Sequence, residues 1–203
     1  MSKLRMAIAD PPYFGTAKRF YSPDGEAYEK GLEYQSNQDS NADLWDNPES
    51  HKELLEYLQD NFKSFAIAMN VHSLPLYLKK IKPSASSGFR VCSWVKTNSA
   101  PTGSRIRNGW EPVLIYNDVT RRSQQSGTRT RDYLICNAPR EGFIGQKPYE
   151  WTEWIVELLG HKEDDTIADL FFGSGAVTSA LIELDIQVEE FQYNLTTEGI
   201  INV

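Results

Sequence analysis

Short apolar stretches alternate with longer amphipathic ones along this chain of 203 residues. The compact apolar runs predict strands, one ending at Ala9 and others over 65–69, 89–95, 112–117 and 167–170. Apolar residues at helical spacing predict helices over about 49–62 and 74–81, after Lys147, and from Ala176 onward. Strands and helices in such alternation predict an α/β fold, with a mostly parallel central sheet and helices on both faces.

The length suits one domain with a substantial core, and no internal repeat is present, so we expect a single domain over 1–203. No apolar run is long enough to cross a membrane and no signal-peptide pattern is present, which predicts a cytoplasmic protein. The two cysteines and three histidines are scattered, so no metal site is expected. One long polar segment, residues 14–47, interrupts the alternation, and we predict that it is an active-site loop.

The first strand ends abruptly at Asp10-Pro11-Pro12-Tyr13. Consecutive prolines have a fixed φ and no backbone N–H, so they continue neither a strand ladder nor a helix interior. They therefore present a carboxylate, a backbone carbonyl and an aromatic ring rigidly at the end of a strand. Acceptors beside a flat ring are suited to holding a planar base by its exocyclic amine. A proline turn without any ligand is the structural alternative.

A second strand, Ile167 to Leu170, runs into a glycine turn with Gly173 and Gly175 before the helical pattern begins. Glycines at a strand-to-helix turn allow positive φ and close approach of a ligand, and the following helix offers unpaired N–H groups. The turn lacks the third glycine of a dinucleotide fingerprint and the Gly-Lys-Ser/Thr of a P-loop. The pattern therefore favours a different adenosine-bearing ligand, with a simple connecting turn as the alternative.

Together, Asp10-Pro11-Pro12-Tyr13 and Asp169-Leu170-Phe171-Phe172-Gly173-Ser174-Gly175 resemble the DNA amino-methyltransferases that use S-adenosylmethionine (SAM). The order of the two motifs resembles the circularly permuted beta class, and Gln146-Lys147-Pro148 resembles its Lys-Pro pair. The resemblance implies a Rossmann-like methyltransferase fold and methyl transfer from SAM to N6 of an adenine flipped out of duplex DNA. The alternatives are cytosine N4, an RNA substrate, or a non-catalytic nucleic-acid-binding or regulatory relative with a degraded cofactor site.

The resemblance also assigns roles to individual residues. Asp10 and the Pro11 carbonyl would accept the N–H bonds of the amine, Pro12 would complete the rigid turn, and Tyr13 would stack on the base. The residues implied in the cofactor site are Asp169, Phe171, Gly173, Ser174, Gly175, Lys147 and Pro148. An acid after the next strand would bind the ribose; this position falls on Gln192, and Glu190 is the nearby candidate.

Basic residues are concentrated in the segment from Lys96 to Arg140. This segment carries a local charge of +5, although the whole chain carries −7. Such segregation predicts a positive face that can meet phosphates, with solvated arginine-rich loops as the alternative. The segment 97–132 and its flank supply the predicted nucleic-acid contacts, namely Lys96, Arg105, Arg107, Arg121, Arg122 and Arg129. Since no separate recognition region is apparent, target selection would rest on these loops, on 14–47, or on a second copy in a homodimer.

Overall fold

The computed structural model describes residues 3–23, 25, 41–83, 87–99, 105–122, 129–140, 145–189, 193–196 and 199–202. Much of the predicted active-site loop 14–47 and parts of the arginine-rich segment 97–132 therefore lie outside the described residues. The same is true of Glu190 and Gln192, the two candidates for binding a ribose.

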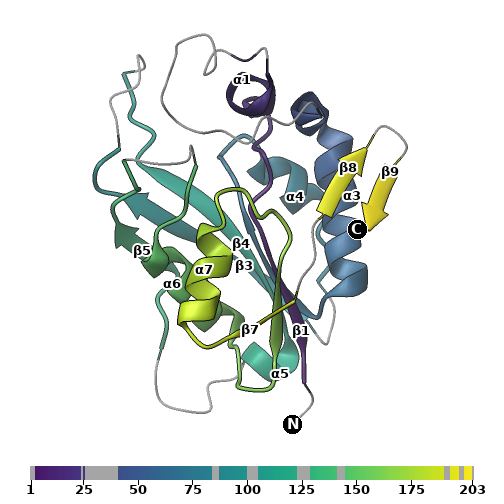
Figure 1. Cartoon of the computed structure of the whole chain (residues 1–203), viewed down its shortest axis with the longest axis vertical. Helices are drawn as coiled ribbons and strands as arrows, with labels where there is room; N and C mark the ends of the chain where they lie inside the picture. The colour runs from purple at the N-terminus through teal and green to yellow at the C-terminus, as the bar shows by residue number, and fades with distance from the viewer. Residues whose placement is uncertain are drawn as a thin grey trace.

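A seven-stranded sheet in the order β5-β3-β4-β2-β1-β6-β7 runs through the centre of the molecule (Figure 1). Strand β4 is antiparallel to both of its neighbours, β2 and β3, and the other pairs in this sheet are parallel. The mostly parallel α/β sheet predicted from the sequence is thus confirmed. Its strands are β1 (Arg5–Ala9), β2 (Ser64–Ala68), β3 (Ser87–Lys96), β4 (Trp110–Asp118), β5 (Tyr133–Cys136), β6 (Thr166–Asp169) and β7 (Gln187–Glu189).

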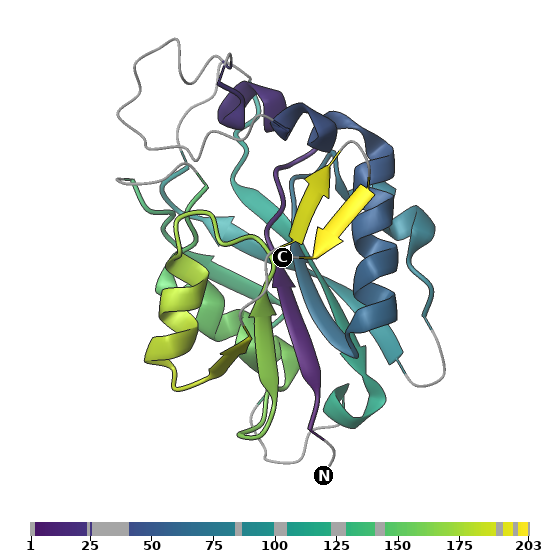
Figure 2. The same ribbon diagram turned by 45° about the vertical axis from the view of Figure 1, so that its right-hand side comes forward.

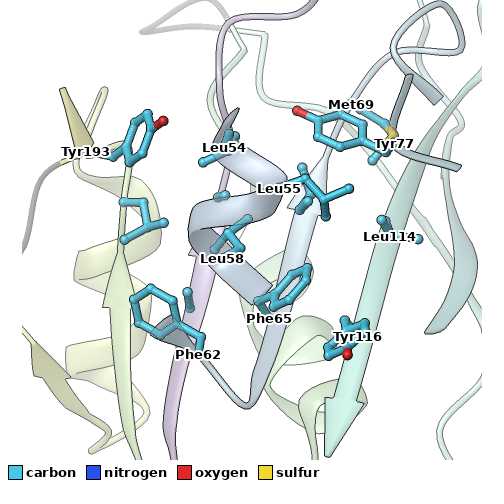
Figure 3. Close-up of a cluster of buried hydrophobic side chains, with 14 of the residues drawn as sticks. Leu54, Leu55, Leu58, Phe62, Phe65, Met69, Tyr77, Leu114, Tyr116 and Tyr193 are labelled. Atoms are coloured by element: carbon cyan, nitrogen blue, oxygen red, sulfur yellow. The ribbon is translucent and has the colours of Figure 1, made fainter. Parts of the chain in front are cut away.

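Helices cover both faces of the sheet, as Figure 2 shows. On one face, α3 and α4 pack over a core that includes Leu54, Leu58, Phe65 and Leu114 (Figure 3). On the other face, α6 and α7 enclose a second apolar cluster. The helices are α1 (Ala17–Tyr21), α3 (Pro48–Asn61), α4 (Leu74–Lys80), α5 (Val119–Arg122), α6 (Tyr149–Leu159) and α7 (Ala176–Glu183), with a 3₁₀ helix η1 (Ala42–Asp46) before α3.

Local signals account for the boundaries of the two longest helices. The Asn47 side chain accepts a hydrogen bond from the N–H of Glu49, and Pro48 occupies the first turn of α3, where its missing N–H costs nothing. Helix α6 ends at Gly160, whose φ of 67° is in the left-handed region that glycine adopts easily. These ends fix where each helix lies along the sheet.

A small antiparallel hairpin, β8 (Tyr193–Thr196) and β9 (Gly199–Asn202), follows the main sheet and lies beside α3 (Figures 1 and 2). The backbone N–H of Tyr193 donates to the carbonyl of Leu170 at 3.0 Å, and the Tyr193 ring lies 5.3 Å from the ring of Tyr57 in α3. The hairpin is therefore anchored where the chain leaves β6.

The sheet has one edge where β1, β2, β3 and β6 end, and ligands of open α/β sheets bind outside such carboxyl ends. We call it the carboxyl edge. The antiparallel strand β4 begins there, at Trp110, and ends at the opposite edge, where Asp118 pairs with Ser87 at the start of β3. Figure 1 accordingly shows α5, which follows β4, near the beginning of β1.

The structure argues against the predicted nucleic-acid role of one residue in α5, Arg121. Arg121 is buried: its guanidinium bonds both carboxylate oxygens of Asp165, the closest contact being 2.7 Å, and the two side chains are 2% and 1% exposed. Asp165 also accepts a hydrogen bond from the backbone N–H of Leu4 at 2.7 Å. The Arg121–Asp165 pair therefore connects α5 with the segments that lead into β1 and β6. Arg121 is thus a structural residue, whereas the predicted contact of Arg122, on the same helix, with nucleic acid stays a prediction.

Candidate active site

The two motifs singled out in the sequence meet at the carboxyl edge. Strands β1 and β6 pair in parallel with Ile8 opposite Asp169, and Asp10 follows Ile8 by two residues. The negative charge of Asp10 contributes to raising the pKa of Asp169, behind the larger effect of burial. The acid before the twin prolines and the strand leading into the glycine turn are therefore close neighbours, although they lie at opposite ends of the chain.

Asp10 forms an ion pair with Lys147, which lies two residues before the start of α6. The Lys147 Nζ lies 2.5 Å from Asp10 Oδ2 and also donates to the carbonyl of Gly145 at 3.0 Å. The Lys147 side chain is 3% exposed and that of Asp10 is 20% exposed. Burial raises the pKa of Asp10 above its usual value, and the Lys147 ammonium opposes that rise. Pro148 follows as the N-cap residue of α6, in an extended conformation.

Tyr13 lies beside Asp10 with its hydroxyl directed into the same group of charges. Its Oη is 3.2 Å from Asp10 Oδ1 and 3.0 Å from Glu111 Oε2. Burial, followed by the charges of Asp10 and Glu111, raises the pKa of Tyr13 well above its usual value. The hydroxyl is therefore protonated at neutral pH and can donate its one proton to either of these carboxylates.

Glu111 and Lys96 form a second ion pair at the carboxyl edge, with side chains 13% and 17% exposed. Lys96 ends β3 and its backbone N–H donates to the carbonyl of Gly109, just before β4. Lys96 was predicted to contact nucleic acid; the structure pairs its ammonium with Glu111, and the contact with nucleic acid stays a prediction. Glu111 was not singled out from the sequence, where the only signal is an acid at the start of an apolar strand.

Asp169 ends β6 and is 4% exposed. Its Oδ2 accepts a hydrogen bond from the Thr178 hydroxyl at 2.9 Å, and its Oδ1 accepts the Phe171 N–H at 3.3 Å. Burial raises the pKa of Asp169 to about 6, against the effect of the Thr178 hydrogen bond. Thr178, in the first turn of α7, is a further residue that the sequence did not single out.

The glycine turn after Asp169 has the backbone that glycine favours. Gly173 and Gly175 have φ of 48° and 76°, and a Cβ on Gly175 would lie 3.0 Å from the Phe172 ring. The Ser174 hydroxyl accepts the N–H of Ala176 at 3.3 Å, at the start of α7. Gly173 and Ser174 are both exposed to solvent.

Phe171 has a different environment from the rest of the predicted cofactor residues. Its ring packs against Trp45 and Tyr193, with centroids 5.3 and 5.7 Å away. This packing favours a role in the core for Phe171, and a contact with the cofactor stays a prediction. The neighbouring Phe172 is 53% exposed at the turn.

The acid expected near the end of β7 is not identified among the described residues. Glu189, the last residue of β7, binds Arg5 through contacts as short as 2.5 Å, so its carboxylate is engaged within the sheet. Glu190 and Gln192 lie outside the described residues, and their predicted contact with a ribose stays a prediction.

The remaining predicted basic residues divide between the two edges. Arg105 and Arg107 are exposed on the segment that leads into β4 at the carboxyl edge, and Ile106 between them is 71% exposed. Arg129 is exposed as well, but it precedes β5, which runs parallel to β3 and so begins away from that edge. Arg105 and Arg107 are therefore the stronger candidates for contact with a ligand bound near Asp10.

Neither a membrane-spanning helix nor a metal-binding cluster is found in the part of the chain that the structure describes. No helix there is both long and apolar enough to cross a bilayer. No three His, Cys, Asp or Glu side chains there are grouped so that they could hold a metal ion.

No protein-family model and no curated protein sequence matches the chain. Solved structures do match it. The crystal structure of the M1.HpyAVI–SAM complex has a TM-score of 0.52 at 15% sequence identity, covering 92% of this chain and 81% of that one. The crystal structure of M1.HpyAVI has a TM-score of 0.50 at 14% identity, covering 92% and 78%. At 15 and 14% identity these likenesses bear on the fold alone, and they confirm the predicted Rossmann-like α/β fold.

Proposed function

We propose that the chain is a SAM-dependent DNA methyltransferase that methylates N6 of an adenine flipped out of the duplex. The observation that carries the proposal is the meeting of Asp10 and Asp169 at the ends of the neighbouring strands β1 and β6, with the Lys147 ammonium buried against Asp10. One motif is suited to holding an amine and the other to holding a cofactor. The likeness in fold to the M1.HpyAVI–SAM complex supports the choice of cofactor.

The Asp10 motif would increase the reactivity of a base's exocyclic amine, which is low in the free base. The nitrogen lone pair is delocalised into the ring, so the amine is a poor nucleophile. Asp10 Oδ1 and the Pro11 carbonyl would accept its two N–H bonds, which orients the lone pair toward the methyl donor. The Asp10 carboxylate would also stabilise the positive charge that develops on the nitrogen, so catalysis rests on positioning and electrostatics. The Tyr13 ring would contact the face of the base.

The residues around the glycine turn fit SAM, which supplies an electrophilic methyl group on its sulfonium when bound. The left-handed backbone of Gly173 and Gly175 shapes the turn, and at the exposed Gly173 the absence of a side chain would let a ligand approach the chain closely. The buried Asp169 carboxylate offers negative charge and acceptor oxygens for a cationic ligand. Ser174, Lys147 and Pro148 would border the same site.

Titration calorimetry with SAM tests the cofactor site, and we expect binding in the micromolar range. Gly175→Ala should weaken it by about tenfold or more, because the added Cβ strains the turn and displaces Phe172. Gly160→Ala is a matched control: its φ is 67° and its Cβ would also meet an atom at 3.0 Å, but it lies at the end of α6. Both variants should lose stability, and Gly160→Ala should bind SAM normally.

No SAM binding by the wild-type chain at any accessible concentration would instead support a non-catalytic relative. The substrate alternatives are separated by incubating the chain with labelled SAM and duplex DNA, single-stranded DNA or RNA. Mass spectrometry of the digested product then distinguishes N6-methyladenine from N4-methylcytosine. The proposal expects N6-methyladenine in duplex DNA.

Arg105 and Arg107 are proposed to bind DNA phosphates near Asp10. The double variant Arg105→Ala/Arg107→Ala should reduce the magnitude of the slope of log K against log salt by about two, since each phosphate contact contributes roughly 0.9 to that slope. Lys79→Ala/Lys80→Ala removes the same charge from exposed positions in the last turn of α4 and serves as the control. Equal slopes for the two double variants, measured by fluorescence anisotropy, would remove the arginines from the interface.

A further inference from the structure

Tyr13 Oη lies between two carboxylates, and each carboxylate has its own lysine. Asp10 is paired with Lys147 at 2.5 Å, and Glu111 is paired with Lys96. The tyrosine hydroxyl joins the two ion pairs, at 3.2 Å from Asp10 Oδ1 and 3.0 Å from Glu111 Oε2. The five side chains form one connected row at the carboxyl edge. The sequence motifs contain Lys147, Asp10 and Tyr13 of this row, but not Glu111 or Lys96.

The hydroxyl has a single proton to donate, so the two carboxylates compete for it. Burial and the two negative charges keep Tyr13 protonated, which means that the competition persists across the neutral pH range. The shorter distance favours donation to Glu111. Lys96 holds the Glu111 carboxylate in the orientation that accepts this bond.

The outcome of this competition affects the oxygen that the proposed reaction needs. Lys147 already donates to Asp10 Oδ2. If Tyr13 also donated to Asp10 Oδ1, both oxygens would be engaged by donors, and the carboxylate would be a weaker acceptor for the amine of a base. Donation to Glu111 leaves Asp10 Oδ1 available.

We infer that Glu111, oriented by Lys96, is a positioning residue that draws the Tyr13 hydroxyl proton away from Asp10. It thereby keeps Asp10 Oδ1 open for the substrate amine. This inference rests on the proposed methyl transfer and extends it to residues outside both motifs. The partial burial of the Glu111–Lys96 pair agrees with such a role, since removing two charges from water at a strand end contributes little to stability by itself.

A double-mutant cycle between Glu111 and Tyr13 tests the inference. Glu111→Gln preserves the shape of the side chain but makes it neutral and a weaker acceptor. The Tyr13 hydroxyl is then expected to donate its hydrogen bond to Asp10 Oδ1 instead. We expect kcat to fall by about 10- to 100-fold, the equivalent of one hydrogen bond to a charged group, with SAM affinity within about threefold of wild type. Tyr13→Phe retains the ring and removes the proton. In that background, Glu111→Gln should change kcat by less than about threefold.

A purely structural role gives a different result. Glu111→Gln leaves Lys96 without its carboxylate whether or not Tyr13 carries a hydroxyl, so a loss caused by misfolding would be equal in both backgrounds. Equal losses of kcat therefore overturn the inference, and thermal unfolding of all four proteins checks their stability. Absence of methyl transfer by the wild-type chain would overturn the proposed function itself, and the inference with it. An active wild type with equal losses overturns only the role of Glu111.

Discussion

Asp10→Asn is expected to slow methyl transfer by about 100- to 1,000-fold while leaving the affinity for SAM within about threefold. The amide preserves the size of the side chain but carries no charge, so it cannot stabilise positive charge on the attacking nitrogen. Removing one such preorganised electrostatic contact typically has an effect of this size. Single-turnover transfer from labelled SAM measures the rate of the chemical step, and titration calorimetry measures the affinity.

Loss of stability must be separated from loss of chemistry in this variant. Lys147 is 3% exposed, and Asp10→Asn leaves its ammonium buried without a counter-charge, which destabilises the fold by up to about 3 kcal/mol. Asp10→Asn/Lys147→Met removes the buried charge and should recover most of that stability. Assayed with saturating SAM, the double variant should remain as slow as the single one. Transfer at the wild-type rate by either variant would contradict the role given to Asp10.

The fold was predictable wherever the signal is local. The helix expected over 49–62 is α3 (Pro48–Asn61), and the strand expected over 65–69 is β2 (Ser64–Ala68), since capping residues and a compact apolar run mark their bounds. Strand β5 was not predicted from the sequence, and β7 was expected only through the resemblance, as the next strand after the glycine turn. Both are short and half-exposed, and they exist because β3 and β6 offer them a partner edge rather than because of their own composition.

In the candidate site, too, the residues with a local signal were predictable and those that depend on the topology were not. Asp10 and Asp169 were predictable as neighbours because Asp10 follows, and Asp169 ends, a buried strand of a mostly parallel sheet. The Glu111–Lys96 pair was not, because it depends on β4 entering the sheet in the opposite direction beside β3. The prediction that Arg121 contacts nucleic acid failed for a related reason. A run of arginines in the sequence indicates a basic surface, but folding brings Arg121 against its partner Asp165, which is distant in the sequence.

Asp169→Asn is expected to make the free protein more stable at pH 8 while weakening SAM binding by about tenfold or more. Burial raises the pKa of Asp169 to about 6 from an ordinary value of 3.8. A carboxyl with a higher pKa in the folded state binds its proton more tightly there, so stability is lost as the pH rises from about 4 to 6. Above pH 6 the charged Asp169 therefore destabilises the fold, and a neutral amide should regain up to about 3 kcal/mol.

Asp165→Asn provides the contrast, because Asp165 is equally inaccessible but serves the fold. Burial alone would raise the pKa of Asp165, but hydrogen bonds from Arg121 and from the Leu4 N–H outweigh it and hold that pKa below its usual value. Its amide variant should therefore lose stability at pH 8 and bind SAM normally. Urea unfolding at pH 4 and pH 8, with calorimetry at pH 8, distinguishes the two aspartates. If Asp169→Asn is also destabilised at pH 8, its carboxylate supports the fold, and the assignment of the glycine turn to a cofactor loses its main charged residue.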